Sequence, residues 1–324
     1  MIAYVVSVLT LVAIFSIVSM ALDVRWGWGG LFDFFIYGLV ALGAYGYGVL
    51  TLPPSPNQPG DTYVLGLSLP PVIGVLGAMA FAAIVSIVVG AVALRQLRQI
   101  FFAIVTFASV LILAAIISGQ SSVFNGYDGL YGITAPFSTT LSPSTYQWVF
   151  LGGCFVVVGV VYVCLERLFW SGFGLSLRAC REDEVAAETF GHRTYTVYLR
   201  AYAIGGAVAG LGGALLAMDL TAWNTGAWTP IETVLVFAAI VVGGSGNSRG
   251  AIVGSAIVFG AISQGTLFIP PIPGLPNVLP AIRSIAVALL LLIALRFRPQ
   301  GILPERHIKE IRESAGDAEQ TSSA

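Results

Sequence analysis

Residues 71–94 read PVIGVLGAMAFAAIVSIVVGAVAL, a run of 24 residues without one charged side chain. An α-helix rises about 1.5 Å per residue, and about 20 apolar residues cross the hydrocarbon core of a bilayer. The run therefore predicts a transmembrane helix. Because similar runs recur on both sides of it, the chain is expected to fold within a membrane.

About nine such runs predict an all-α fold, a polytopic membrane helix bundle of about nine transmembrane helices. They cover about residues 2–22, 31–52, 71–94, 100–118, 147–165, 199–220, 231–244, 251–268 and 279–297. The first run lacks the positive region and cleavage site of a signal peptide, so it is interpreted as a retained span. The Gly- and Trp-rich stretch at residues 26–30 indicates either a broken helix that lines a cavity or an ordinary turn.

The composition excludes a soluble enzyme. Of the 324 residues, 57% are hydrophobic and 10% are charged, whereas about 25% are charged in soluble domains. A net charge of −1 leaves no basic stripe for nucleic acid, so no nucleic-acid partner is expected. Three cysteines and two histidines lack the number and spacing of a disulfide framework or a zinc site, so no metal is expected.

The motifs of common catalytic sites are also missing from the sequence. It has no Gly-x-x-x-x-Gly-Lys-Ser/Thr loop for nucleotide and no His-Glu-x-x-His motif. The Gly-rich segment at residues 243–250 has the wrong spacing for dinucleotide binding and joins two predicted spans. We therefore expect no catalytic residue and no cofactor in this chain.

Basic residues predict the orientation of the bundle. If the loop with Arg95 and Arg98 lies inside, alternation places 14 of the 15 basic residues on that side, and Arg283 is the exception. Cytoplasmic loops carry the excess of Lys and Arg. The N-terminus is then outside and the C-terminus inside.

Two domains are expected: a transmembrane domain at residues 1–304 and a polar, disordered cytoplasmic tail at residues 305–324. The main inner loop, about residues 166–200, carries clustered charge, and its centre predicts a short amphipathic helix that stops at Gly191. Such a helix either docks in a groove of a partner or lies solvated near the lipid head groups. The outer stretch at residues 119–146 has no basic residue and is interpreted as either a partner-facing segment or a solvated loop.

One ionisable residue, Asp33, is expected within the bilayer, where an acid is costly and marks a functional site by default. It stands alone among aromatic residues, which does not make a proton relay. It either lines a path or lies close enough to the inner surface to be wet. The candidate translocation path comprises Asp33, Phe34, Tyr37 and Tyr45.

Glycines that recur every four residues predict close packing between helices. They form two groups, Gly206 with Gly210, and Gly246, Gly250 and Gly254.

Several motifs resemble permease subunits of branched-chain amino acid ABC importers, in particular the type conventionally called M rather than its H-type partner. The most specific are LRACREDEVAAE at residues 177–188, followed by Gly191, and FRPQG at residues 297–301. ALDVRWGWGGLF at 21–32, FAIVT at 102–106 and VGGSG at 242–246 agree with them. The resemblance runs from about residue 21 to residue 303.

The resemblance implies a membrane-spanning permease subunit that forms half of the translocation path for branched-chain, hydrophobic amino acids. It implies as partners an H-type permease, two cytoplasmic ATPase subunits that bind ATP and magnesium, and a periplasmic or lipid-anchored solute-binding protein, in the lipid bilayer of a bacterial inner (plasma) membrane. The implied ATPase-coupling residues are Arg178, Arg181, Glu182, Asp183, Glu184, Ala186, Ala187 and Gly191. ATP-driven closure of the ATPases would then move this segment as a lever.

Two other functions stay open at this point. Relatives of the same class carry urea or short amides, and residues 31–36 and 98–101 depart from the common family pattern, so the cargo is left open. A stand-alone secondary transporter is an alternative of another class. The scarcity of intramembrane charge argues against it, because a coupling ion needs ligands.

Overall fold

The computed structural model describes residues 2–54, 66–95, 99–136, 141–227, 230–263, 278–298 and 300–305, and helices make up most of it. The helices are α1 (Ile2–Arg25), α2 (Ile36–Thr51), α3 (Pro71–Ala93), α4 (Gln99–Gly119), α5 (Ser121–Phe124), α6 (Pro143–Phe169), α7 (Gly172–Glu182), α8 (Glu184–Thr189), α9 (Thr194–Leu220), α10 (Pro230–Gly243), α11 (Ser248–Ser255) and α12 (Val278–Phe297). A 3-10 turn, η1 (Thr225–Ala227), precedes α10, and a π-helix, η2 (Ala256–Ser263), continues α11.

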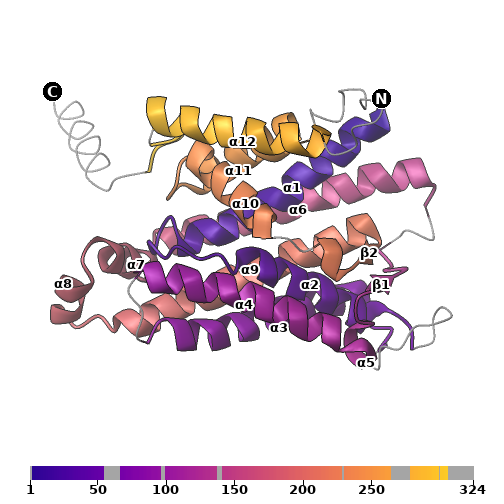
Figure 1. The fold of residues 1–324 in the computed structure, drawn as a ribbon, viewed down its shortest axis with the longest axis horizontal. Helices are drawn as coiled ribbons and strands as arrows, with labels where there is room; N and C mark the ends of the chain where they lie inside the picture. Colours follow the sequence, from indigo (N-terminus) through magenta and orange to yellow (C-terminus); the bar gives the residue numbers. More distant parts are fainter. Residues whose placement is uncertain are drawn as a thin grey trace, which may run out of the picture.

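The long helices lie side by side along the longest axis of the molecule (Figure 1). Helices α7 and α8 lie at one end. The start of α1 lies at the opposite end, together with α5 and two short strands, β1 (Leu130–Tyr131) and β2 (Ala222–Trp223). The strands pair antiparallel, so the loop after α4 is tied to the end of α9.

Five helices are long and apolar enough to cross a membrane, namely α1, α3, α4, α6 and α9. Segments Glu232–Gly243 and Ser248–Ile262 make a sixth if they count as one span, bent by 117°. The apolar segments Ile36–Thr51 and Ile285–Phe297 are shorter. The predicted helical, polytopic membrane protein is thus confirmed, whereas nine crossings and their orientation stay predictions.

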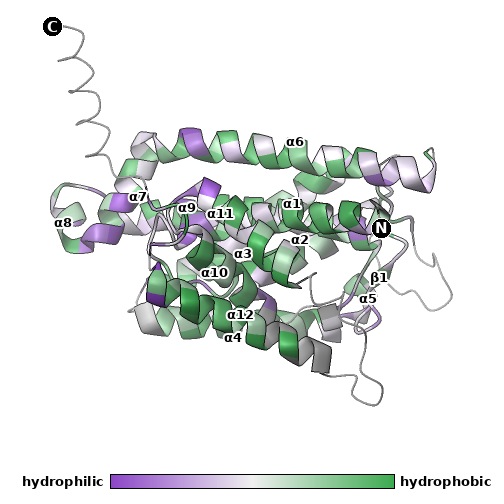
Figure 2. Cartoon of the chain, turned by 90° about the horizontal axis from the view of Figure 1, so that it is seen from above, coloured by the Kyte–Doolittle hydropathy of each residue, from purple (hydrophilic) through white to green (hydrophobic). Residues whose placement is uncertain are grey.

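The surface hydropathy fits a lipid environment. Figure 2 shows apolar residues along the outer helices and a hydrophilic concentration around α7. Few side chains of α3 and α4 are buried, although nearly all of them are apolar. Water would penalise such a surface, but hydrocarbon does not.

Helix α9 lies between α1, α2 and α3 and is mostly buried, because its glycines admit neighbouring backbones. A Cβ at Gly210 would lie 2.6 Å from the Cβ of Ala82 on α3, and one at Gly206 would lie 2.5 Å from the Cβ of Ser86. Any side chain at these positions would push α3 away.

The second glycine group lies at the bend between α10 and α11. A Cβ at Gly254 would lie 2.9 Å from the backbone nitrogen of Gly243, and one at Gly250 would lie 2.6 Å from the carbonyl oxygen of Gly244. Gly246 takes a positive φ of 79°, which glycine adopts without strain. Both groups thus lie where backbones approach closely.

Candidate functional site

The chain leaves α1 at Arg25 and re-enters a helix only at Ile36. Tight turns fill the gap: the backbone N–H of Trp28 donates to the carbonyl of Asp23 at 2.9 Å, and that of Gly30 donates to the carbonyl of Trp26 at 2.8 Å. Gly30 has a φ of +69°, the left-handed region that glycine tolerates. This segment, residues 26–35, is called the break; it shortens α2 relative to the predicted span.

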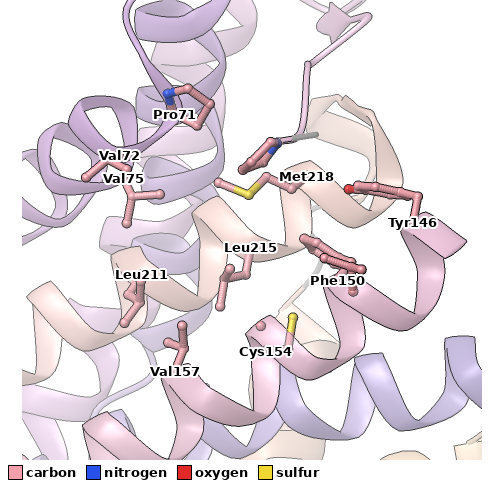
Figure 3. A pocket seen from close by; sticks show the side chains of 13 residues that line it. Pro71, Val72, Val75, Tyr146, Phe150, Cys154, Val157, Leu211, Leu215 and Met218 are labelled. Atoms are coloured by element: carbon pink, nitrogen blue, oxygen red, sulfur yellow. The ribbon is translucent and has the colours of Figure 1, made fainter. Parts of the chain in front are cut away.

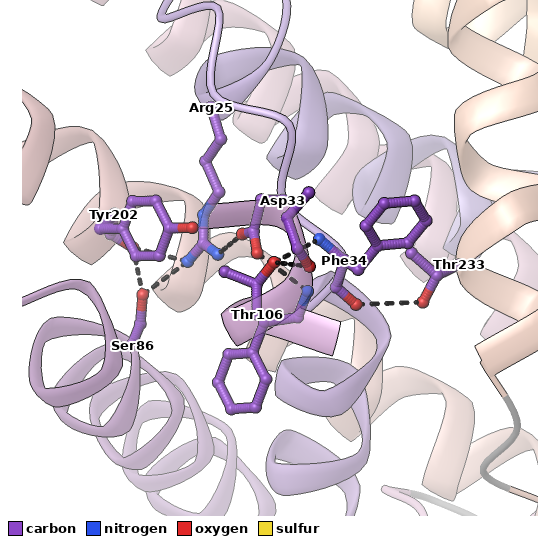
Figure 4. A network of polar contacts seen from close by, with 9 residues as sticks. Arg25, Asp33, Phe34, Ser86, Thr106, Tyr202 and Thr233 are labelled. Atoms are coloured by element: carbon purple, nitrogen blue, oxygen red, sulfur yellow. Dashed lines mark hydrogen bonds and ion pairs between the residues drawn. The ribbon is translucent and has the colours of Figure 1, made fainter. Parts of the chain in front are cut away.

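An ion pair closes the break across the interior of the bundle (Figure 4). The guanidinium of Arg25 pairs with the carboxylate of Asp33, and both side chains are fully buried. Arg25 also donates to the hydroxyl of Ser86 at 2.5 Å and to the carbonyl of Tyr202 at 2.7 Å, and it lies 4.2 Å from the centre of the Tyr202 ring. Asp33 also accepts the backbone N–H of Phe35 at 2.8 Å. Both charges are therefore paired and hydrogen-bonded, as buried charges must be.

The prediction that Asp33 is an acid without a basic partner is wrong. Arg25 stands eight positions earlier in the sequence. The predicted topology places it in a loop at the inner surface. The break folds back so that the two side chains meet, and a Gly-rich stretch between one base and one acid was the signal available in the sequence.

Two hydroxyls extend the network around Phe34. The backbone N–H of Phe34 donates to the Thr106 hydroxyl on α4 at 3.2 Å, and the Thr233 hydroxyl on α10 donates to its carbonyl at 3.4 Å. Since Arg25, Ser86 and Tyr202 lie on α1, α3 and α9, one polar network joins five helices.

The other candidate path residues lie within packed regions. The Phe34 ring lies 5.3 Å from the rings of both Phe32 and Phe237, between centroids. Tyr37 and Tyr45 are buried on α2, and the Tyr45 ring meets Phe124 edge-on at 5.4 Å. None of the four candidates lines the large cavity between α3, α6 and α9.

The coupling segment forms two helices, where the sequence predicts one. Asp183 has extended backbone, and its carboxylate accepts the backbone N–H of Ala186 at 3.0 Å, so it caps α8 and ends α7. Asp is a strong N-cap residue, which explains the interruption. Gly191 has a φ of +87° directly after α8 and ends the helical run where the sequence predicts it.

Arg178 faces the protein interior. Its Nε donates to the carbonyl of Gly174 and its terminal nitrogen to that of Phe169, both at 3.2 Å, and the guanidinium lies 4.0 Å from the centre of the Phe169 ring. Burial lowers the pKa of the Arg178 guanidinium, but the two carbonyl oxygens that accept its hydrogen bonds stabilise the charged form. Arg178 therefore fastens the corner between α6 and α7.

Arg181 joins α7 to two other segments. It donates to the carbonyl of Gly27 in the break and to the carboxylate of Glu305, the latter at 2.9 Å. The Glu305 side chain lies against Gly246, whose backbone N–H donates to the carboxylate of buried Asp23 at 2.7 Å. These five residues are called the junction, since they tie the end of α1, the break, α7, the α10–α11 bend and the C-terminal segment together.

The remaining coupling residues form an exposed surface around α8. Glu182, Asp183 and Glu184 are exposed, Ala186 is half-buried, and Ala187 is buried beneath them. Two apolar side chains of the predicted amphipathic helix, Val185 and Phe190, are 72% and 84% exposed. This surface, together with Glu188, is called the α8 surface; it is acidic with an apolar centre.

Potential metal ligands are scattered. Within the described ranges, no three His, Cys, Asp or Glu side chains come together as a metal site. Cys154, Cys164 and Cys180 are all free thiols. Of the tail predicted at residues 305–324, the structure describes Glu305 alone.

Apolar outer helices, a buried ion pair at a broken helix and an exposed acidic helix at one end define the class as a multi-pass membrane protein. Residues 4–295 match the family of the permease component of branched-chain amino acid transport systems. The chain belongs to this family, and it is a transport component rather than an enzyme.

Several relatives carry matching names. The probable branched-chain amino acid transport permease protein LivM of Methanocaldococcus jannaschii is 26% identical over 94% of this chain and 96% of the relative. The high-affinity system permease LivM of Escherichia coli is 26% identical over 78% of this chain and 61% of the relative. The probable permease LivH of M. jannaschii is 29% identical over about half of each chain. No solved structure matches this chain.

Proposed function

We propose that this chain is one of two permease subunits of an ATP-driven importer that carries branched-chain, aliphatic amino acids. The observation that carries the proposal is the family match over residues 4–295 together with the LivM likeness over 94% of the chain. The half-length likeness to a LivH protein supports pairing with a second, related permease. The plasma membrane is the expected location, with a solute-binding protein on its outer side.

The proposed topology has nine crossings, with the N-terminus outside and the C-terminus inside. Support comes from α1 starting at the end opposite α7 and α8 (Figure 1). Arg167, Arg178, Arg181 and Arg193 gather at the α7 end, as expected of a cytoplasmic face. The 117° bend between α10 and α11 turns the chain back, as the two crossings proposed for this pair require.

The α8 surface is the proposed docking site for an ATPase subunit that binds ATP and magnesium. Phe190 and Val185 are the largest exposed apolar side chains there, and exposed glutamates surround them. Such an apolar centre with a charged rim fits a groove lined by apolar and basic residues. Arg178 and Arg181 act behind this surface, since their hydrogen bonds point into the permease.

The junction is the proposed route by which movement of α8 reaches the bundle. Arg181 holds both the break and the C-terminal segment, so displacement of α7 pulls on Gly27 and Glu305 together. The break in turn carries Asp33, whose ion pair reaches α1, α3 and α9. Asp33 then serves as a positioning residue for the helices.

Uptake of labelled leucine tests the function. Vesicles hold this chain with its partner permease, ATPases and solute-binding protein, with and without ATP, and urea serves as a second cargo. ATP-dependent leucine uptake that disappears without this chain is the expected result. Uptake of urea but not of leucine would replace the proposed cargo by urea. Uptake without the ATPases would refute the importer and favour a secondary transporter.

The docking surface has its own test, Phe190→Asp. A charge at an apolar anchor is expected to abolish co-purification of the ATPases and leucine uptake while the chain stays inserted. Tyr127→Asp is the matched control, because Tyr127 is 80% exposed in the loop between α5 and β1, and these two elements lie at the opposite end of the molecule (Figure 1). Equal ATPase binding by the two variants would refute docking through α8.

A further inference from the structure

A large cavity lies between α3, α6 and α9, away from the junction. Its volume is about 530 Å³, within the range of small-molecule sites. Figure 3 shows side chains of the three helices facing one another across it. The lining is almost wholly apolar and includes Val75, Phe150, Val157, Leu211, Leu215 and Met218. From Met218 to Leu211 the cavity follows α9 for about 10 Å along its axis, so it reaches from the end of the helix into the bundle.

A second, smaller pocket of about 350 Å³ adjoins it and shares Tyr146, Phe150 and Met218 with it. This pocket lies between the first turns of α1, the start of α6 and the end of α9, at the end of the molecule opposite α8. About half of its lining is polar, contributed by residues that include Ser7, Gln147, Asp219 and Thr221. An apolar chamber and a polar chamber therefore meet at three residues.

Two polar groups of the smaller pocket, one of them at the meeting point, lack partners among the described residues. The hydroxyl of Tyr146 is buried without a hydrogen bond among the described residues. The carboxylate of Asp219 makes no hydrogen bond or ion pair within the same part of the chain, and no basic residue lines the pocket. A buried polar group is normally paired, so the Tyr146 hydroxyl is available to a ligand, and the partly exposed Asp219 carboxylate faces the same pocket.

The polar pocket has two electrical poles. Asp219 stands in the last turn of α9, where the helix carries partial negative charge that adds to the carboxylate. Pro143, the first residue of α6, lines the same pocket, and a helix start carries partial positive charge. One pole attracts an ammonium group and the other attracts a carboxylate.

We infer that these two chambers form a binding site for an α-amino acid with an aliphatic side chain. Asp219 binds the ammonium group, the start of α6 and the Tyr146 hydroxyl face the carboxylate, and the apolar cavity holds the side chain. The inference rests on the proposed function and extends it, because it gives the permease its own selectivity beyond that of the solute-binding protein.

The first test is equilibrium binding of labelled leucine to the purified complex of both permeases and ATPases, without the solute-binding protein. Asp219→Asn removes the charge at nearly constant volume and is expected to weaken binding by about 10- to 100-fold. Asp128→Asn is the matched control, an exposed aspartate of the β1 loop that lines neither chamber. Equal weakening by both variants, or by neither, would overturn the site.

Two competitors test the role of the ammonium group. Isopentylamine has the amine and the branched chain without a carboxylate. 4-Methylpentanoate has the carboxylate and the branched chain without an amine. The amine is expected to displace leucine from the wild-type complex better than the acid does, and this preference is expected to vanish in Asp219→Asn. Equal competition in the wild-type complex would refute the assignment.

A glycine pair tests the apolar chamber. A Cβ at Gly152 or at Gly153 meets no atom within 4 Å, and Gly153 lines the cavity whereas Gly152 does not. The substitution Gly153→Leu is expected to fill the chamber with a side chain and to abolish binding of the labelled amino acid. Gly152→Leu is expected to leave that binding unchanged. If wild-type vesicles take up leucine with ATP but both glycine variants bind leucine equally, this inference alone falls; if wild-type vesicles show no leucine uptake, the proposed function falls.

Discussion

Replacing Asp33 by asparagine is expected to destabilise the protein strongly, because it leaves the Arg25 guanidinium without its carboxylate in the interior. Both side chains of the pair are fully buried. Removing one partner of a buried ion pair costs about 3–5 kcal/mol. Arg25 keeps its bonds to Ser86 and to the Tyr202 carbonyl, so the lower part of that range is expected.

This cost translates into a measurable melting shift. In chains of a few hundred residues, about 1 kcal/mol lowers Tm by roughly 2 °C. Asp33→Asn is therefore expected to lower Tm by about 6–8 °C in thermal unfolding of the detergent-purified protein. The control is Asp128→Asn, an exposed aspartate, which is expected to unfold like the wild type.

The double variant Arg25→Met/Asp33→Leu separates the charge from the packing. It removes both charges of this pair, and the Ser86 hydroxyl still donates to the Tyr202 carbonyl at 2.6 Å. Most of the lost stability is expected to return, since apolar replacement of a whole buried pair is often neutral. A Tm of Asp33→Asn within 2 °C of the wild type, or a double variant as unstable as the single one, would refute the reasoning.

Three further predictions concern packing and the α7 corner. Gly213→Ala places a Cβ against the α2 backbone and is expected to cost about 1–3 kcal/mol, whereas Gly152→Ala on an open face is neutral; thermal unfolding compares them. Arg178→Lys loses the contact with the Phe169 ring and one of two carbonyl bonds, so limited proteolysis is expected to cut faster near residue 170. Burial raises the pKa of the Cys180 thiol; since the thiolate reacts, maleimide labelling at pH 7 is expected to be slow and to rise about tenfold per pH unit, and mass spectrometry measures it.

Sequence alone predicts those parts of the fold that depend on uninterrupted apolar length. Helices α3, α4 and α6 begin and end within a few residues of the predicted spans, because lipid-facing helices need little beyond hydrophobicity. The pairing of Arg25 with Asp33 depends on how the break folds back, and hydropathy carries no information on that path. Hydropathy averaged over a window of the sequence registers Arg25 and Asp33 only as two charged residues that lower the score at the ends of two predicted spans.

The coupling segment shows a different kind of limit. Its helical character and its end at Gly191 follow from composition, yet the interruption at Asp183 does not, because acidic residues also occur inside helices. The sequence also does not predict which way each charged side chain points. Arg178 and Arg181 are predicted to belong to a partner-facing surface, but both turn inward and donate to backbone carbonyls. A helix of alternating charge and apolar residues has several faces, and only its neighbours decide which one is free.

The break combines two roles that would otherwise require separate parts of the molecule. At Gly27 it accepts a hydrogen bond from Arg181 of α7, and at Asp33 it holds the ion pair that reaches α3 and α9. Only five residues separate these contacts, and the turns between them are hydrogen-bonded, so the segment resists stretching. A rigid link with packed elements at both ends transmits displacement, because packed interiors repack between discrete arrangements and do not deform continuously. In the proposed importer, force applied at the α8 surface therefore reaches the helices that border the amino acid site without any side chain of the break contacting the cargo.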